Sequence, residues 1–390
     1  LSLRRQRQMC IRDRLNAVIR RDGSSKFNQA NRWGSFPSVS AAWRINNESF
    51  FKVKDVNELK LRVSYGELGS GNIRDYAYIP TINTMGAIVM GSGQTLNPSA
   101  IQVQLANPNL RWETLKQTNF GFDLAMFDNK LSVTADYFIA RTEDVLFGFP
   151  ILLSTGNDGG NPISNAATVQ NKGFEFNVGW NDKIGDDFNW NANVNFTKLN
   201  NKLVALGNGQ NQSFNGNTVT RNGQPVGMWY VLQTDGIFQN QADVLAHTNA
   251  DGEVIQPTAL PGDIRYKDNN GDGQITDADK VIAGSPWPKF EMGFNGGFEY
   301  KGLDFSMNWI LSHGATVYNG ARSILDVVDG QHNYLAGTRP WTPENPNTDT
   351  PRANTGTTLS SRGDTDRFLE DGSFARLKYV GIGYNLPKDI

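Results

Sequence analysis

The sequence predicts an all-β fold, a partial transmembrane antiparallel β-barrel of about ten strands with long extracellular loops. Three observations predict it. Apolar and polar residues alternate over runs of strand length, as in strands with one apolar face. Pairs of these runs are separated by tight turns, at residues 128–130, 183–187 and 301–302. The connections between successive pairs are far longer, and short turns on one side with long loops on the other are typical of outer-membrane barrels.

The alternating segments are expected to be strands at about residues 15–27, 35–45, 59–66, 118–127, 131–142, 174–180, 188–199, 290–300, 303–311 and 374–386. In four of them, apolar residues occupy every second position: Val39, Ala41, Trp43 and Ile45; Leu59, Leu61, Val63 and Tyr65; Phe188, Trp190, Ala192, Val194 and Phe196; and Leu303, Phe305, Met307, Trp309 and Leu311. Their other faces are rich in Asn, Ser, Thr and Gly, as in a hydrated lumen. Several segments reach the ~9–11 residues that a tilted strand needs to cross a bilayer. Strands of globular proteins usually have ~5–6 residues.

The turns give the barrel a direction. If the three tight turns lie on the periplasmic side, parity places residues 46–57 there too. The long connections, residues 67–113, 143–172, 200–289 and 312–373, then all lie outside. Structureless loops of this length argue against a compact soluble domain.

The composition fits two classes of protein. The chain has 390 residues with 40 Gly, 11% aromatic residues and 19% charged residues. No stretch approaches the ~18 consecutive apolar residues of a membrane helix. A soluble β protein and a barrel whose strands are apolar on one face both fit these values.

The first residues are interpreted as an artefact. Residues 4–13, RRQRQMCIRD, match at every position the in-frame translation of a transposon-based sequencing adapter. Residues 1–14 are therefore excluded from the fold prediction, and residues 15–390 are interpreted as protein. The alternative is a basic arm for nucleic acid or anionic lipid. Since the segment holds five Arg and one Asp, its removal changes the formal net charge from −2 to −6. It also removes Cys10, the only cysteine, which excludes disulfides, thiolate metal sites and cysteine nucleophiles.

Residues 268–279 match the twelve-residue calcium loop D-x-[DN]-x-[DN]-G. The candidate Ca²⁺ ligands are Asp268, Asn270, Asp272, Gln274 (through its backbone carbonyl), Thr276 (directly or through water) and Asp279. Gly273 stands at the sixth position and permits the sharp turn. Asp279 replaces the usual Glu at position 12, so its shorter arm reaches the ion less well. The expected role is structural, to rigidify the longest external loop. The alternative is a Gly/Asn-rich turn that binds nothing.

Aromatic residues fall at two kinds of position. Trp43, Trp180, Tyr300 and Trp309 lie near strand ends and fit either interfacial girdles or ordinary packing. Trp229, Tyr230, Tyr334 and Trp341 lie in external loops, where they could stack on sugars, contact a partner or pack within the loop.

Signatures of an enzyme are absent. His247, His313 and His332 lie in loops without metal-ligand spacing. None of the motifs G-x-S-x-G, G-x-x-x-x-G-K-[ST] and H-E-x-x-H occurs. A glycoside hydrolase would need a catalytic carboxylate pair, which the sequence does not locate.

Five strings stand in order along the chain: AVIRRDGSSKF (17–27), FPSVSAAWRI (36–45), LKLRVSYG (59–66), NPNLRWE (107–113) and FLEDGSFARLK (368–378). In order and spacing they resemble the barrel of SusC/RagA-type TonB-dependent transporters. The resemblance implies a 22-stranded barrel in the bacterial outer membrane, plugged by an N-terminal domain, that imports glycans or peptides. It implies as partners a SusD-like surface lipoprotein, the TonB complex and outer-membrane lipid, and no nucleic acid.

The expected identity is therefore the C-terminal portion of such a barrel, without its plug, its TonB box and its final strands, and not an enzyme. One alternative of a different class remains at this stage. A soluble or surface-attached all-β glycan-binding protein, stabilised by calcium, would show the same alternation.

Overall fold

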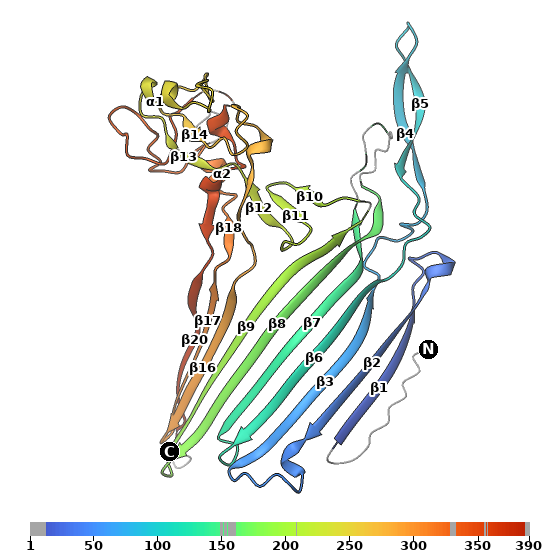
Figure 1. The fold of residues 1–390 in the computed structure, drawn as a ribbon, viewed down its shortest axis with the longest axis vertical. Coiled ribbons are helices and arrows are strands. Elements are labelled where there is room, and N and C mark those ends of the chain that lie inside the picture. Colours follow the sequence, from blue (N-terminus) through green and yellow to red (C-terminus); the bar gives the residue numbers. More distant parts are fainter. Residues whose placement is uncertain are drawn as a thin grey trace.

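Ten strands form one antiparallel sheet, in the order β1-β2-β3-β6-β7-β8-β9-β16-β17-β20. The computed structural model describes residues 13–148, 151, 154, 161–207, 209–327, 333–354, 356 and 358–386. The sheet curves like part of a barrel and is open between β1 and β20 (Figure 1). We call this sheet the wall. Residues 1–12, most of the segment interpreted as an adapter, lie outside the described residues.

The strands of the wall are β1 (Asp13–Gly23), β2 (Trp33–Arg44), β3 (Val56–Ser70), β6 (Glu113–Met126), β7 (Leu131–Gly148), β8 (Ile163–Ile184), β9 (Phe188–Leu206), β16 (Phe290–Tyr300), β17 (Leu303–His313) and β20 (Phe374–Tyr384). Each predicted segment corresponds to one of them, so the ten-stranded antiparallel prediction is confirmed. The largest differences are in β7, β8 and β9, which continue past the predicted ends.

The tight turns gather at one end of the wall, which we call the turn end. Lys301 and Gly302 both have positive φ, 47° and 85°. This is the backbone of a type I′ turn, whose twist matches that of the two strands it joins. Between β6 and β7, Phe127, Asp128 and Asn129 also have positive φ. The Phe127 amide donates to the Asp55 carbonyl at 2.8 Å, so the neighbouring connection holds this turn in place.

The register of the wall aligns the apolar faces of its strands. Leu61 of β3 lies opposite Trp43 of β2 on one side and Phe122 of β6 on the other. Farther along, Phe298 of β16 lies between Trp190 of β9 and Phe305 of β17. Because side chains alternate between the faces of a sheet, one face of the wall is apolar and the other polar.

Long connections leave the opposite end, which we call the loop end. Between β3 and β6, a two-stranded hairpin of β4 (Thr81–Met90) and β5 (Thr95–Gln104) projects beyond the wall (Figure 1). Short 3-10 turns occur at Gln29–Asn31, Ile45–Asn47, Asp277–Asp279, Leu359–Ser361 and Asp366–Phe368. No helix in the described part of the chain is long and apolar enough to cross a membrane.

The two longest connections fold together above the loop end (Figure 1). We call the described residues of 209–289 and 314–373 the outer body. Its sheets are formed by β10 (Gln212–Asn215), β11 (Thr218–Arg221), β12 (Met228–Val231) and β15 (Val281–Gly284); by β13 (Thr234–Ile237) and β14 (Ile264–Tyr266); and by β18 (Thr316–Tyr318) and β19 (Leu369–Asp371). Its helices are α1 (Gln241–Ala246) and α2 (Arg322–Leu325). The sequence predicts these connections as long loops and does not predict the strands within them.

Buried apolar residues concentrate at the loop end and in the outer body. One cluster joins Leu232, Ile264 and Tyr266, and another joins Phe238, Val244 and Ala259. At the loop end, Leu203 and Leu206 of β9 pack against Ala166 and Ala167 of β8, and a further cluster surrounds Phe27. The wall below them is one sheet thick, so its stability comes from backbone pairing and from what covers its two faces.

Candidate functional site

The apolar face of the wall is exposed over most of its strands. Val39, Val63, Leu377 and Ile382 are 45%, 42%, 43% and 74% exposed. Exposed apolar side chains recur on neighbouring strands from β1 to β20, whereas soluble monomers rarely expose contiguous apolar patches larger than a few hundred Å². It fits lipid as the neighbouring solvent and disfavours the soluble alternative.

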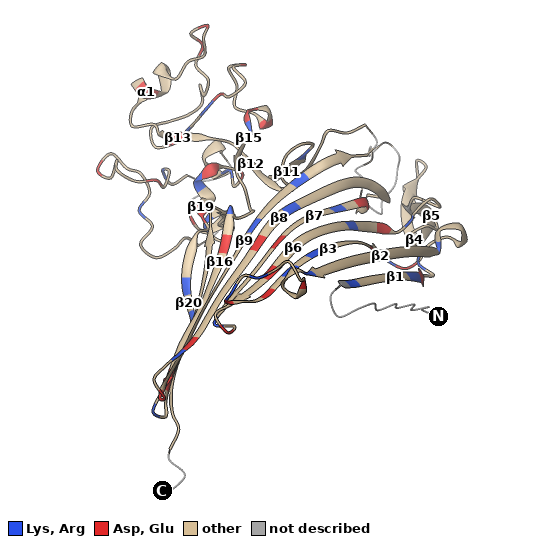
Figure 2. Ribbon diagram, turned by 60° about the horizontal axis from the view of Figure 1, so that its bottom comes forward, with Lys and Arg blue, Asp and Glu red and all other residues tan. Residues whose placement is uncertain are grey.

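The polar face carries ion pairs on β3, β6 and β7. The Arg62 guanidinium donates to the Asp123 carboxylate at 2.9 and 3.0 Å and to Asp136 at 2.9 Å, and Lys60 donates to Asp123 at 2.9 Å. Basic and acidic residues therefore lie beside one another on neighbouring strands, as Figure 2 shows. Such pairs need a hydrated or protein-covered surface, because lone charges in hydrocarbon are costly.

On β8, β9, β16 and β17 the polar face carries neutral amides beside carboxylates such as Glu175, Glu291 and Asp304. Asn177 and Asn193 exchange hydrogen bonds of 3.2 and 2.9 Å. In the same way, Asn308 donates to Asn295 of the neighbouring strand. The alternation that predicts a hydrated lumen thus produces a polar face with ion pairs on β3, β6 and β7 and with amide pairs on β8, β9, β16 and β17.

The strand-end aromatics are mostly exposed. Trp43, Tyr300 and Trp309 are 42%, 44% and 38% exposed, as girdle residues would be, whereas Trp180 packs against Phe127 with ring centroids 6.1 Å apart. Among the loop aromatics, three pack within the outer body: the Trp229 indole donates to the Thr316 carbonyl, Trp341 to the Gln239 side chain, and Tyr230 contacts Phe214. Tyr334 is exposed.

The calcium-like loop, residues 268–279, lies in the outer body between β14 and β15. Its first carboxylate, Asp268, accepts from the amides of Gly271 and Gly273 at 2.6 and 2.8 Å. Burial acts first to raise the pKa of Asp268, but these backbone donors outweigh it and the pKa is lowered. Asn270 and Asp272 are linked at 2.9 Å, and Asp272 also accepts from the Gln274 amide. The structure therefore gathers the first four predicted ligand positions into one compact turn.

Asp279, the last residue of the loop, binds back to Asn269 near its start. Its carboxylate accepts from the amides of Asn269 and Thr276 at 3.0 and 2.8 Å. The residue is fully buried, and no Lys, Arg or His of the described chain pairs with it within 4.0 Å. Amide and hydroxyl donors of Asn269, Asn270 and Thr276 offset part of the cost of burying this carboxylate. Its neighbour Asp268 is a second carboxylate close enough to interact. Two neighbouring carboxylates that no described Lys, Arg or His pairs with fit a bound cation.

The described residues contain no group of three or more Asp, Glu, His or Cys side chains arranged to hold a metal. The predicted set therefore relies on amide, hydroxyl and backbone oxygens as well as carboxylates. Hard cations such as Ca²⁺ accept these ligands.

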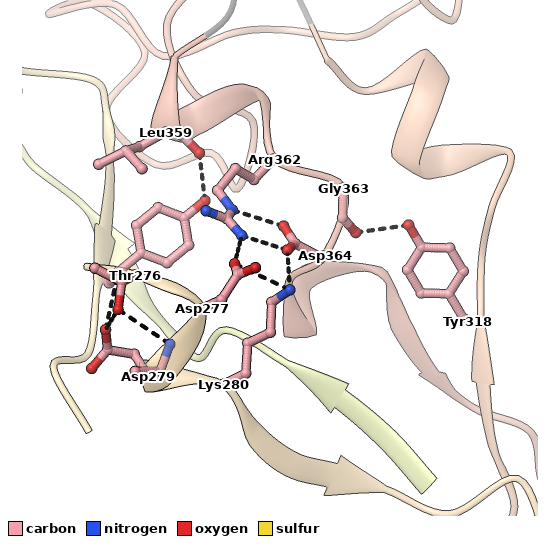
Figure 3. Close-up of polar contacts among 11 residues, drawn as sticks. Thr276, Asp277, Asp279, Lys280, Tyr318, Leu359, Arg362, Gly363 and Asp364 are labelled. Atoms are coloured by element: carbon pink, nitrogen blue, oxygen red, sulfur yellow. Dashed lines mark hydrogen bonds and ion pairs between the residues drawn. The ribbon is translucent and has the colours of Figure 1, made fainter. Parts of the chain in front are cut away.

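One residue of this loop belongs to a network of four charged residues, which we call the latch: Asp277, Lys280, Arg362 and Asp364 (Figure 3). Arg362 holds Asp364 through two hydrogen bonds of 2.8 and 2.5 Å and reaches Asp277 at 2.5 Å. Lys280 contacts Asp364 at 2.7 Å and Asp277 at 3.3 Å. Burial acts first on Asp364 to raise its pKa, but Arg362 and Lys280 outweigh it and lower the pKa well below the usual range.

The histidines form no shared site in the described chain. His247 contacts Phe238, and burial lowers its pKa. His313 lies at the end of β17, where its ring faces Phe290. His332 lies outside the described residues.

A family model for the TonB dependent receptor-like β-barrel matches residues 12–281. The chain belongs to this family. Among curated relatives of this receptor chain, TonB-dependent receptor P3 of Formosa agariphila is 33% identical over 384 residues, covering 95% of the chain and 37% of that protein. TonB-dependent receptor SusC of Bacteroides thetaiotaomicron is 27% identical over 381 residues, covering 94% and 36%.

A solved structure titled as the RagAB peptide transporter matches the receptor chain with a TM-score of 0.78 at 24% identity, covering 97% of this chain and 40% of that one. This likeness shows the fold. The receptor chain spans a little over a third of the length of its curated relatives. The predicted SusC/RagA-type resemblance and the outer-membrane location are confirmed, and the relatives are receptors, not enzymes. The turn end is therefore periplasmic and the loop end extracellular.

Sequence reasoning finds the wall and the calcium-like loop of this receptor but misses Arg362 and Asp364. They lie 85 or more residues from Asp277 along the chain. No local pattern marks them, because an Arg-x-Asp string is common in loops.

Proposed function

We propose that the full-length receptor imports oligosaccharides or peptides across the outer membrane, powered through TonB and assisted by a SusD-like surface lipoprotein. The observation that carries this proposal is the wall. Its outward face is apolar, its inward face is charged and amide-lined, and its chain matches SusC and RagA-type barrels along nearly its whole length. A surface that is dry outside and polar inside suits a water-filled passage through lipid.

Expression of the full gene in its host tests the membrane part of the proposal. A closed barrel resists detergent until heated, so the unboiled protein is expected to migrate faster on a gel than the boiled protein and to fractionate with the outer membrane. A full-length protein that stayed soluble without detergent would contradict the proposal.

Growth on single nutrients tests the substrate class. A deletion strain is expected to lose growth on one class, oligosaccharides or peptides. It should regain growth with the wild-type gene but not with a gene whose TonB-contacting segment is removed. Normal growth of the deletion strain on both classes, at limiting concentrations, would contradict import.

Co-purification tests the partner. A tagged receptor is expected to retain a lipoprotein encoded by the neighbouring gene, and the pair is expected to survive gel filtration in detergent. A receptor that elutes alone when both proteins are expressed would contradict the partnership.

We further propose that residues 268–279 bind Ca²⁺. The support is the oxygen-rich turn around Asp268, Asn270 and Asp272 above the buried Asp279 carboxylate. Six to eight oxygen ligands are usual for Ca²⁺, so carbonyl and water oxygens would complete the set. The ion would offset carboxylates that otherwise repel one another.

Calorimetric titration of the full-length receptor in detergent tests this site. Asp268→Asn is expected to weaken Ca²⁺ binding strongly. Asp251→Asn, an equal loss of charge in the same connection outside residues 268–279, is the matched control and is expected to leave binding unchanged. No heat with the wild type, or equal loss in both variants, would contradict the site.

A further inference from the structure

The latch joins two connections that are far apart in the sequence. Asp277 and Lys280 belong to the connection between β9 and β16, whereas Arg362 and Asp364 belong to that between β17 and β20. The Arg362 guanidinium lies between the two carboxylates, with its fork on Asp364 and one arm on Asp277 (Figure 3). A planar fork of this kind fixes both distance and angle, which a point charge does not.

Three of the four latch side chains are largely shielded from water, so their charges interact more strongly than those of exposed ion pairs. The side chains of Lys280 and Asp364 are 13% and 19% exposed, and that of Arg362 is 26% exposed. Asp277 is 73% exposed, so its contact alone would be screened by water. Hydrogen bonding to Asp364, the first cause, raises the pKa of Arg362.

Backbone contacts continue the link on the Arg362 side. The Leu232 amide donates to the Asp364 carbonyl at 2.9 Å, and the Asp366 amide returns a bond to the Leu232 carbonyl at 3.0 Å. The buried Tyr266 hydroxyl donates to the Leu359 carbonyl at 2.7 Å. Residues 358–368 are thus bound along their length to the body that carries the calcium-like loop, and they lead directly into β19 and the wall strand β20.

In the connection between β9 and β16, one short turn contributes a residue to the calcium-like loop and a residue to the latch. Asp277 and Asp279 belong to the same 3-10 turn, capped by the Thr276 side chain. Asp279 points beneath the calcium-like loop, and Asp277 points to Arg362. A contact that holds Asp279 in place therefore also holds Asp277 in the position from which it pairs with Arg362.

We propose that the latch couples the calcium-like loop to residues 358–368, so that a cation bound at 268–279 orders that segment and the entry into β20. This rests on the Ca²⁺ site proposed above. The two longest external connections then behave as one unit whose order depends on external Ca²⁺. Because coupling between two sites is reciprocal, an intact latch also tightens Ca²⁺ binding.

Amide hydrogen exchange of the full-length receptor in detergent, with saturating Ca²⁺ or with a chelator, tests the coupling. In the wild type, the chelator is expected to speed exchange in both 268–280 and 358–368. In Arg362→Lys, which keeps the charge but loses the fork, 268–280 is expected to respond while 358–368 exchanges fast with or without Ca²⁺. Arg111→Lys is the matched control, since Arg111, in the connection between β3 and β6, makes a similar two-bond pair with Asp144 of β7.

The Ca²⁺ affinity of the same variants supplies a second readout. Arg362→Lys is expected to raise the Kd by about fivefold or more, within the usual range of coupling between sites. A purely electrostatic role predicts no change in Arg362→Lys and tighter binding in Arg362→Gln, and that result would overturn the coupling. The exchange experiment has two contradicting outcomes. If Ca²⁺ changes wild-type exchange in 268–280 but not in 358–368, the coupling is overturned.

If neither segment responds to Ca²⁺ in the wild type, the Ca²⁺ site itself is wrong, and the coupling falls with it. Nutrient uptake is measured separately, so import can stand or fall independently.

Discussion

The wall and the outer body are stabilised in different ways, although one chain builds both. Wall strands pair over eleven or more successive residues in several places, and side chains such as Val63 remain 42% exposed. The outer body has strands of three or four residues, and its stability comes from small buried clusters such as Leu232, Ile264 and Tyr266. The wall therefore depends on its surroundings, whereas the outer body depends on contacts within itself.

The largest expected loss of stability comes from a substitution in the core of the outer body, and it should leave the wall intact. Leu232→Ala removes a fully buried side chain from its cluster, and we expect a loss of about 2–5 kcal/mol in local stability. Exchange in the outer body should accelerate while the gel mobility of the unboiled barrel is unchanged. The exposed Leu260→Ala is the control. Loss of the barrel in Leu232→Ala would show that the two regions are one folding unit.

A charge on the apolar face breaks the wall alone. Val63→Lys places a lysine at the middle of β3, and we expect a cost of about 2–4 kcal/mol if that position meets the bilayer centre. Ser64→Lys, one residue along and on the polar face, should cost far less. The temperature at which the unboiled form is lost in lipid vesicles measures both variants. Equal effects would contradict the assignment of the faces.

A smaller effect is expected at the β16–β17 turn. Gly302 has φ 85°, and a Cβ there would lie 2.9 Å from the Asn385 carbonyl oxygen. Gly302→Ala should therefore cost at least the ~1–2 kcal/mol of a left-handed non-glycine residue. Gly185→Ala, at a turn with positive φ and open space, is the control without the clash. Chemical unfolding of the barrel measures the stability of both variants. Equal losses of stability would show that the close contact with the Asn385 carbonyl oxygen adds no cost.

The smallest effect is the pH dependence of the latch. The pKa values of Asp364 and Asp277 are lowered in the folded protein from the usual 3.8. Their stabilisation is therefore complete above about pH 4 and is lost as the pH falls through the lower folded values. We expect exchange in 358–368, corrected for the intrinsic rate, to stay constant from pH 8 to about 5 and to rise below about 4. Exchange in Arg362→Lys should change less over the same range.

The same contrast explains what the sequence predicts. A two-residue period is a local signal, so the strand around Leu59, Leu61 and Val63 is readable from eight residues. The calcium-like loop is readable because its spacing is fixed within twelve. The fold of the outer body cannot be read from the sequence, because it depends on contacts between distant residues. Tyr266 bonds to Leu359 across 93 residues, and Arg352 bonds to Asp263 across 89. Short strands such as β12 carry too few residues to show a period.

Accessibility along β3 tests the central claim, that the wall separates lipid from a polar lumen, most directly. The chain after residue 14 has no cysteine, so spin labels can be placed singly at residues 59–66 of the full-length receptor in lipid vesicles once other thiols are removed. The wall predicts high oxygen accessibility at Leu59, Leu61, Val63 and Tyr65 and low accessibility at Lys60, Arg62 and Ser64. Loss of the alternation, or access of a water-soluble quencher to both sets alike, would contradict a membrane-spanning wall.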